Sequence, residues 1–329
     1  MSYNSLTRRR SFDIDVQNNT YAGKLALPFL TPALKANDTV ANNYVRVLDG
    51  IHYKAVLPVN SSTSNIQSGG CDYNDGANLE INEAVLTLSE LAVNETLCRS
   101  TVYPTWHGAA TGRADTDVMT QEFKNFTLGL VASRAAATLE NYIWLSESTS
   151  AIYAQGFLSN DGVFDEAGVD ASKLAGCTES TIVSLTAANV IAQIGVVYAL
   201  TASSKPGVLG KADCGIYINS KTAALYRQGL ATAGGAGYVN QVTLQAFEQL
   251  NYLGTPIRVC PGMPDDCIIV AAQENLVFGT NLGTDLSVVK WIPAYEYDGS
   301  DNIKIVMRMA VGAAVGVVTD VVVGATFWT

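Results

Sequence analysis

Histidine is almost absent from this sequence, and the cysteines are scattered. The only histidines are His52 and His107, and the six cysteines stand at positions 71, 98, 177, 214, 260 and 267. Structural zinc sites need closely spaced Cys and His ligands, and a disulfide framework needs a denser pattern than this one. The spacing therefore argues against both. In a reducing compartment these thiols are expected to be buried apolar residues.

Positive charge is scarce as well. Lys and Arg total 20 against 30 acidic residues, which gives a formal net charge of −10. Tight, sequence-independent wrapping of nucleic acid needs a cationic surface, so the charge argues against this function. A container that holds DNA loosely remains compatible with an acidic chain. Arg8, Arg9 and Arg10 form a basic cluster near the N-terminus, but no apolar signal-peptide core follows them.

Long apolar segments free of charge are also lacking. The best candidate for a membrane span, Met309–Trp328, contains Asp320 and is dominated by Val and Gly. Buried strands interrupted by a turn are the better interpretation, and no membrane partner is expected.

The patterns of common catalytic and cofactor sites are incomplete or missing. Residues 205–213 approach a phosphate-binding loop but have Lys205 where the first glycine belongs, and residues 234–240 lack the third glycine of a dinucleotide fingerprint. No Gly-x-Ser-x-Gly elbow is present. Asp265 and Asp266 favour a solvated turn over a cation site. We therefore expect no catalytic, cofactor-binding or metal-binding residues, and we expect that the protein is not an enzyme.

The N-terminal half contains an arm, a hairpin and a helix. Residues 1–48 show little periodicity, which is typical of an arm that becomes ordered by lying on another surface. Two strand-like runs, at 50–59 and 79–93, enclose a polar, Gly-rich tip and predict a long hairpin. A helix of about thirty residues follows from Asp115 or Thr116. Its expected packing face carries Met119, Phe123, Phe126 and Leu130.

The C-terminal half predicts a compact mixture of helices and strands. Residues 184–203 form a helix capped by Ser or Thr, and a strand at 215–218 leads into another helix that begins at Asn219 or Ser220. Short strands flank the sequence Pro261-Gly262-Met263-Pro264, which predicts a sharp turn. The last clear pattern alternates, with one set of residues facing the core and Lys304 and Arg308 facing outward; the inner set is Ile303, Ile305, Met307 and Met309.

This order of elements resembles the major capsid proteins of tailed double-stranded DNA phages, which have the Hong Kong 97-type fold. The resemblance is carried by "SLTAANVIAQIGVVYAL", "DCGIYINSKTAALYRQGL", "YLGTPIRVCPGMPDDCIIVAAQENLVFGTNL" and "IKIVMRMAVGAAVGVVTDVVV". It implies an α+β fold with five parts: an N-terminal arm at 1–48, an extended hairpin loop at 49–112, a peripheral domain with a spine helix at 113–178, an axial domain at 179–294, and return strands of the peripheral domain at 295–329.

The resemblance also implies a function and a set of contacts. Copies of the chain would assemble into hexamers and pentamers of an icosahedral shell around double-stranded DNA, in a virion built in a bacterial cytoplasm. Expected assembly contacts are the axial turn at Pro261, Gly262, Met263 and Pro264, the extended loop at Lys54, Cys71, Asp72, Asp75 and Cys98, and the arm at Arg8, Arg9 and Arg10. Scaffold, portal and decoration proteins are further partners that it allows.

Two details concern covalent links between copies. Lys54 is the only lysine between Asp49 and Pro104 and lies near the base of the loop, so no lysine–asparagine crosslink is predicted. Cys71 and Cys98 on the loop leave a disulfide between subunits as a hypothesis. Two other functions stay open: an encapsulin-like compartment for enzyme cargo, and an α+β enzyme or carbohydrate-binding protein with no recognisable site.

Overall fold

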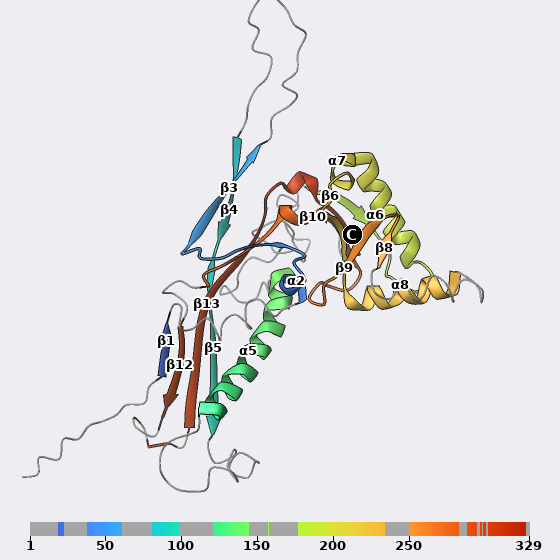
Figure 1. Ribbon diagram of the computed structural model, residues 1–329. Helices are drawn as coiled ribbons and strands as arrows, with labels where there is room; N and C mark the ends of the chain where they lie inside the picture. The colour runs from blue at the N-terminus through green and yellow to red at the C-terminus, as the bar shows by residue number, and fades with distance from the viewer. Residues whose placement is uncertain are drawn as a thin grey trace, which may run out of the picture.

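The protein has two bodies and a hairpin that projects beyond both (Figure 1). The computed structural model describes residues 19–22, 38–60, 81–98, 121–144, 157, 177–233, 250–282, 288–294, 297, 299–300 and 302–326. Each body is built on a six-stranded sheet, and the hairpin forms a separate two-stranded sheet. We call the two larger sheets peripheral and axial.

The peripheral sheet is centred on its longest strand, β13 (Asn302–Val315). Met307 of β13 pairs with Val289 of β12 and with Val93 of β5, so these two strands flank it on opposite edges. β11 pairs with the far end of β13 and in turn with β2, and β1 pairs with β12. The flanking strands are β1 (Asn19–Ala22), β2 (Arg46–Leu48), β5 (Ser89–Cys98), β11 (Leu276–Thr280) and β12 (Val288–Pro293).

The alternation expected in β13 is confirmed. Lys304 and Arg308 are exposed, while the alternate residues Ile303, Ile305, Met307 and Met309 face the core and are all at most 1% exposed. One side of the strand therefore builds the core, as a period of two requires.

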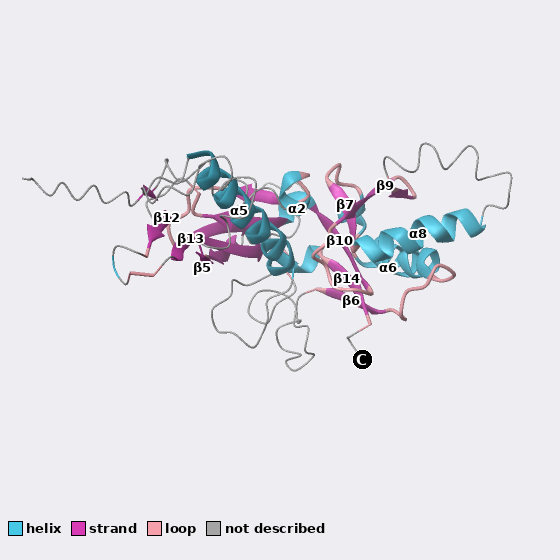
Figure 2. Cartoon of the chain, turned by 90° about the horizontal axis from the view of Figure 1, so that it is seen from below, coloured by secondary structure: helices cyan, strands magenta, loops and turns pink. Residues whose placement is uncertain are grey.

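A long helix, α5 (Gln121–Trp144), crosses the peripheral sheet and contacts β13 (Figure 2). Its expected packing face is wrong at Phe126 and Leu130, which are 62% and 44% exposed. Met119 and the side chain of Phe123 lie outside the described part. The buried stripe is rotated from that face and consists of Leu128, Val131, Ala132, Ala135, Leu139 and Ile143. This stripe stays apolar along the helix, whereas the face of Phe126 and Leu130 continues into the exposed Ser133 and Ala137. The expected N-terminal cap at Asp115 or Thr116 lies outside the described residues.

The axial sheet has the order β6-β14-β10-β7-β9-β8. Its strands are β6 (Thr178–Thr181), β7 (Cys214–Ile218), β8 (Asn251–Tyr252), β9 (Thr255–Val259), β10 (Cys267–Ala272) and β14 (Val322–Ala325). β7 and β10 are buried along their whole length. A strand that is apolar throughout needs cover on both faces of its sheet.

Helices supply that cover on one face. α6 (Val190–Ser204) and α8 (Ser220–Ala233) lie side by side against the axial sheet (Figure 2), and the short α7 (Pro206–Leu209) follows α6. Ile216 and Ile218 of β7 belong to the core beneath these helices. Tyr217, between them, belongs to the other core cluster, which also contains the buried stripe of α5. The opposite face of the axial sheet thus joins the peripheral core.

The helix starts confirm one prediction and correct another. α8 begins at Ser220, and the Oδ1 of Asn219 accepts a hydrogen bond from the backbone N–H of Lys221 at 3.1 Å, as expected of a cap. The expected Ser or Thr cap of α6 is wrong, because α6 begins at Val190 after Asn189. The Asn189 side chain instead bonds back to the preceding loop, at Ser184 O and Thr186 N.

Two of the chain's crossings between the two sheets lie at neighbouring points. β10 leads through η2 (Gln273–Asn275) into β11, and β13 leads back through η3 (Val318–Asp320) into β14. The Asn275 side chain joins the crossings: its Nδ2 donates to Val317 O at 2.8 Å and its Oδ1 accepts from Val317 N at 2.6 Å. The prediction of buried strands interrupted by a turn at 309–328 is confirmed for its described part, residues 309–326. Among the described helices, none has the length and hydropathy needed to span a membrane.

These crossings divide the chain differently from the expected domain ranges. β11 and β12 lie within residues 179–294, which were assigned to the axial domain, yet both pair with β13 in the peripheral sheet. β14 lies within 295–329, assigned to the peripheral return, yet pairs with β10 in the axial sheet. Hydrogen-bonding partners far along the chain, which a linear reading does not show, decide this division.

The described parts of the arm lie on the chain's own body. β1 pairs with β12, β2 pairs with β11, and α2 (Asp38–Ala41) buries Thr39 and Val40. The expectation that the arm is ordered only by another surface is corrected for these residues. Arg8, Arg9 and Arg10 lie outside the described residues.

The predicted hairpin is confirmed at its base. β3 (Lys54–Asn60) and β4 (Ile81–Thr87) are antiparallel, with Lys54 opposite Thr87 and Asn60 opposite Ile81. The predicted tip, residues 61–80, lies outside the described part. The second run was predicted as one strand, but at Leu88 the chain leaves the hairpin and enters β5 of the peripheral sheet.

Candidate functional site

The turn at Pro261–Pro264 links β9 to β10, but these strands do not pair with each other. Both pair with β7, which lies between them, so the turn crosses the end of β7. Cys260 and Cys267, on either side of the turn, are both 0% exposed. The interpretation of these cysteines as buried apolar residues is confirmed.

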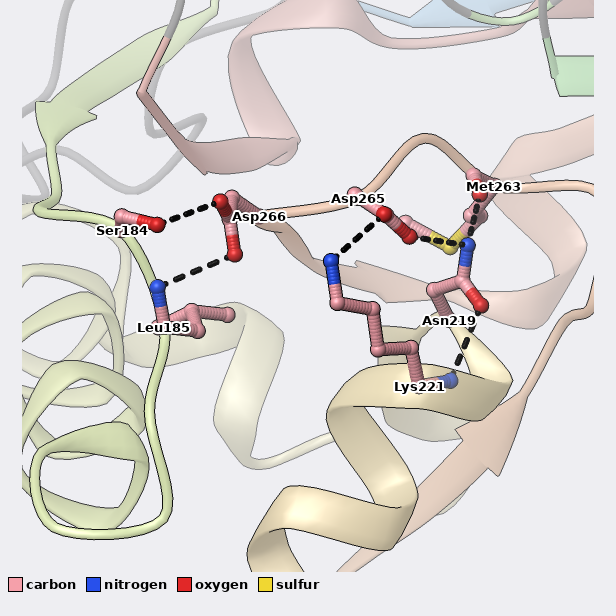
Figure 3. A network of polar contacts seen from close by, with 7 residues as sticks. All are labelled: Ser184, Leu185, Asn219, Lys221, Met263, Asp265 and Asp266. Atoms are coloured by element: carbon pink, nitrogen blue, oxygen red, sulfur yellow. Dashed lines mark hydrogen bonds and ion pairs between the residues drawn. The ribbon is translucent and has the colours of Figure 1, made fainter.

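The turn is held against the start of α8 by polar contacts (Figure 3). The amide of Asn219 donates to the carbonyl oxygen of Met263 and, at 3.3 Å, to Asp265 Oδ1. Lys221 Nζ lies 2.7 Å from Asp265 Oδ2, in an exposed ion pair. Asn219 therefore makes two contacts: its side-chain oxygen caps α8, and its side-chain NH2 group holds the turn.

Asp266 fastens the other side of the turn to the loop before α6 (Figure 3). Its carboxylate accepts hydrogen bonds from Ser184 Oγ at 2.9 Å and from Leu185 N at 3.0 Å. Asp266 has a positive φ of 57°, a conformation that aspartate tolerates better than most residues. The adjacent carboxylates at 265 and 266 thus point to different partners and do not form a shared cation site.

Gly262 brings the turn into backbone contact with α5. Its N–H donates to Glu140 Oε1 at 3.4 Å, and a Cβ at this position would collide with the Glu140 carbonyl oxygen. Met263, the next residue, is 2% exposed within the core that contains α5. The turn is thus the point at which the axial sheet meets the long helix.

Glu140 is a buried carboxylate that joins three parts of the chain. It is 6% exposed, and it accepts from Thr39 Oγ1 at 2.5 Å and from Thr39 N at 3.0 Å, in addition to Gly262 N. Trp144 Nε1 completes the network by donating to Thr39 Oγ1 at 3.1 Å. Burial raises the pKa of Glu140, although the hydrogen bonds from Thr39 and Gly262 oppose the shift.

Arg258 forms a second buried centre on the axial sheet. Its guanidinium donates to Tyr217 Oη at 2.5 Å, and to the backbone oxygens of Tyr44 at 3.2 Å and Asp213 at 3.0 Å. Gln273 Oε1 accepts a further bond at 3.2 Å. A Cβ at Gly215 would come within 2.7 Å of Arg258 Nε, so the glycine makes room for this side chain. Arg258 thereby ties the segment after α2 to the axial sheet.

The buried polar and thiol groups of the subunit have a structural role. Burial raises the pKa of the Cys177 thiol to about 12, and it raises the pKa of Cys214 and Cys260 as well. Thiolates are the reactive form of cysteine, so these three thiols are suppressed as nucleophiles. No group of three His, Cys, Asp or Glu residues within the described ranges is placed to hold a metal ion.

A groove of about 550 Å³ runs between α5 and β5. Its walls include Leu91 and Val93 of β5 and Val131 and Leu139 of α5. Arg308 and Glu90 form an exposed ion pair of 3.0 Å at its rim. Exposed pairs of this kind contribute little to stability.

The residues expected in the extended loop are only partly described. Lys54 is exposed at the start of β3, with Nζ 5.4 Å from the centre of the Tyr53 ring, and Cys98 is half-buried at the end of β5. Cys71, Asp72 and Asp75 lie outside the described residues. Lys54 and Cys98, the two that are described, lie in different sheets.

Two apolar residues on the hairpin face solvent. Val56 and Val85 are directly opposite each other in the register, and they are 54% and 48% exposed. Leu86, on the other face of the hairpin, is 0% exposed. The base of the hairpin is therefore packed on one face and bare on the other.

Comparison with known proteins identifies this architecture. No family model and no curated protein matches the sequence. Solved structures match over nearly the whole chain: a capsid of a native GTA particle is 15% identical, with a TM-score of 0.54 over 99% of each chain. The procapsid of satellite phage P4, whose structure includes a size determination protein, is 12% identical, with a TM-score of 0.58 over 91% of this chain and 90% of that one.

The capsid of Myoviridae phage XM1 agrees, with 10% identity and a TM-score of 0.52 over 88% of this chain and 92% of that one. This chain has the fold of phage major capsid proteins. The α+β, Hong Kong 97-type fold expected from the sequence is confirmed. At these identities the likeness establishes the capsid fold, and function has to be argued from the surfaces.

Sequence reasoning missed the two buried centres of this capsid fold. Glu140 is a carboxylate on the buried stripe of α5, four residues after Ala136 and four before Trp144. A charged residue in that position was the available signal. Arg258, likewise, is a charge in a short apolar strand. Neither stood out because the packing face of α5 was assigned incorrectly and β9 was read without its neighbours.

Proposed function

We propose that this chain is the structural subunit of an icosahedral phage capsid. Copies self-assemble into hexamers and pentamers, and these close into a shell around double-stranded DNA. The observation that carries this proposal is the full-length match of an elongated two-sheet body with a projecting hairpin to chains from assembled capsids. The role is non-enzymatic, in a virion assembled in the host cytoplasm.

The exposed face of the hairpin is evidence for assembly between copies. An isolated two-stranded hairpin is marginally stable in water and gains stability by packing on a further surface. Only one face of the base packs on its own subunit, and the exposed Val56 and Val85 form an apolar pair on the other. We infer that this pair lies on a neighbouring copy.

The outer face of α5 supports the same function. Phe126 and Leu130 lie one helical turn apart and are both exposed. Large apolar residues gathered on a regular face are typical of a surface that becomes covered in an assembly. Modest contacts repeated around closed rings add up to a stable shell.

The residues predicted as assembly contacts differ in whether they are available on the surface of the subunit. Gly262 and Met263 are buried inside the subunit, so a contact at the axial turn would use Pro261, which is exposed, and Pro264, which is half-buried. Lys54 and Cys98 would contribute from the base of the loop. Cys71, Asp72 and Asp75 would contribute from its tip, and Arg8, Arg9 and Arg10 would contribute from the arm.

The charge supports a loose relationship with DNA. A net charge of −10 disfavours a tight grip on phosphates, so packaged DNA can enter and leave the shell. Portal, scaffold and decoration proteins are the further partners of such a shell.

A disulfide between Cys71 and Cys98 of different copies predicts that a reductant weakens isolated particles. Unchanged particle stability in the reductant would contradict this disulfide.

The test is negative-stain electron microscopy of the chain expressed alone, with light scattering on the same sample. Closed shells, or rings of five or six copies, are expected. A monodisperse monomer across protein and salt concentrations would contradict self-assembly by the chain alone. Assembly that needs a scaffold protein would then be tested by co-expression. The monomer would also favour the alternative of an α+β enzyme or binding protein.

A further inference from the structure

The β8–β9 hairpin ends in a two-residue loop of unusual composition. Asn251 pairs with Pro256 and Tyr252 with Thr255, which leaves Leu253 and Gly254 as the loop. Their φ angles are 47° and 85°. Two positive φ angles in a two-residue hairpin loop define a turn that strongly prefers Asn-Gly or Asp-Gly. Leucine in the first position is therefore unfavourable for folding.

Leu253 is the exception among the described residues with positive φ other than glycine. The other two are Asn43 and Asp266, whose short polar side chains suit this conformation. Asp266 in addition accepts two hydrogen bonds there. Leu253 has no such compensation: it is 72% exposed, the highest value among the large exposed apolar residues in the described part of the chain. Strained backbone that is retained without a benefit to the fold points to function.

The base of this hairpin is held firmly, so the tip is presented in a fixed position. Tyr252 lies edge-on to Tyr198 of α6, with ring centroids 5.5 Å apart. Its hydroxyl lies over Gly195, where a Cβ would come within 2.8 Å of it. Tyr226 of α8 donates a hydrogen bond to Asn251 O at 2.9 Å. The loop is therefore a rigid apolar knob next to two helices.

We propose that Leu253 inserts into the surface of a second copy of this chain and anchors the contact between axial domains in a ring. This inference rests on the proposed capsid function, which supplies identical copies at a fixed spacing. A contact repeated around a ring uses one patch on each copy against a different patch on the next. A preorganised, exposed leucine suits such a contact, because little entropy is lost when it becomes buried. Val196, beside Gly195 on α6, is 47% exposed and adds apolar surface to the same domain.

The proposal predicts opposite effects on folding and on assembly. Leu253→Asn gives the turn a preferred residue, so the thermal unfolding midpoint of the dissociated subunit rises. It also removes the apolar knob, so the protein concentration at half-assembly rises at least about ten-fold. Leu253→Met is the matched control: it retains an apolar side chain of similar volume and is expected to assemble within about two-fold of the wild type.

The measurement is light scattering against protein concentration for the three full-length chains, with thermal unfolding of each dissociated chain. If Leu253→Asn is more stable and assembles like the wild type, the anchor is disproved while the capsid function stands. If the wild type and Leu253→Met both stay monomeric, alone and when co-expressed with a scaffold protein, the proposed function fails and this inference fails with it. Loss of assembly in Leu253→Asn, with both controls assembled, is the expected result.

Discussion

Gly262 of the axial turn lies directly against the backbone carbonyl of Glu140 in the long helix. This contact exists only because residue 262 has no Cβ. The peripheral and axial parts of the subunit therefore meet backbone to backbone, and the fit depends on one hydrogen atom in place of a methyl group.

Gly262→Ala is accordingly expected to destabilise the subunit by about 2–4 kcal/mol, since the obstructing atoms are main chain and cannot rotate away. Chemical denaturation of the dissociated chain measures this. The control is Gly129→Ala, at an exposed position of α5 with nothing near its Cβ. That change should raise stability by about 0.5–1 kcal/mol, because alanine favours helix. Equal stability of the two variants would show that the turn and helix do not touch.

The burial of Glu140 predicts how the stability of the folded subunit depends on pH. Its pKa in the folded chain is raised, first by desolvation. The neutral form is therefore favoured in the folded state, and this contribution is full below the ordinary carboxyl pKa and lost as pH rises through the raised value. The difference in unfolding midpoint between the wild type and Glu140→Gln should move in favour of the wild type as pH falls from about 8 to about 4. A constant difference would mean that Glu140 does not titrate in this range. The opposite slope would mean that the hydrogen bonds from Thr39 and Gly262 outweigh burial.

Arg258→Lys tests the second buried centre. A lysine keeps the charge but cannot reach acceptors as widely separated as Tyr44 O, Asp213 O and Gln273 Oε1. Buried acceptors without donors are costly, so we expect a loss of about 2–3 kcal/mol in the free energy of unfolding. The same substitution at the exposed Arg308, paired with Glu90, should change it by less than about 0.5 kcal/mol. Denaturant titration of both variants decides, and similar losses would contradict the role given to Arg258.

The two faces of the hairpin should behave differently when altered. Replacing Val56 and Val85 by threonine retains β propensity, so the dissociated subunit should keep its stability within about 0.5 kcal/mol while assembly is weakened. Leu86→Ala, on the buried face, should cost about 2–5 kcal/mol in stability. Thermal unfolding and light scattering separate the effects. Normal assembly of the double threonine variant would remove the hairpin's outer face from the contacts between copies.

Local patterns in the sequence predicted local structure well. The alternation around Met307, the cap at Asn219 and the turn after Cys260 all depend on neighbours in the chain, and each was confirmed. The failures involve distant partners. Phe126 and Leu130 begin an apolar face that continues into the exposed Ser133 and Ala137, whereas the buried stripe stays apolar to Ile143. The prediction was wrong because it followed only the first turns of the helix.

The role of the candidate site in assembly stays a prediction. The turn residues were predicted as a contact with other subunits, and within the subunit Gly262 and Met263 also hold its own parts together. Glu140 is separated from Gly262 by 122 residues and from Thr39 by 101. A contact over such distances requires knowledge of the tertiary fold, and no local signal reports it.

The paired crossings joined by Asn275 have a mechanical meaning. Two covalent connections that run side by side and are bonded to each other oppose twisting of one sheet against the other far better than a single linker does. The contact between Gly262 and Glu140 attaches the two sheets at a different place. A body fixed at several separate points behaves as one stiff plate. If such plates tile a closed surface, the change of angle from one place on that surface to another has to arise at the seams between plates.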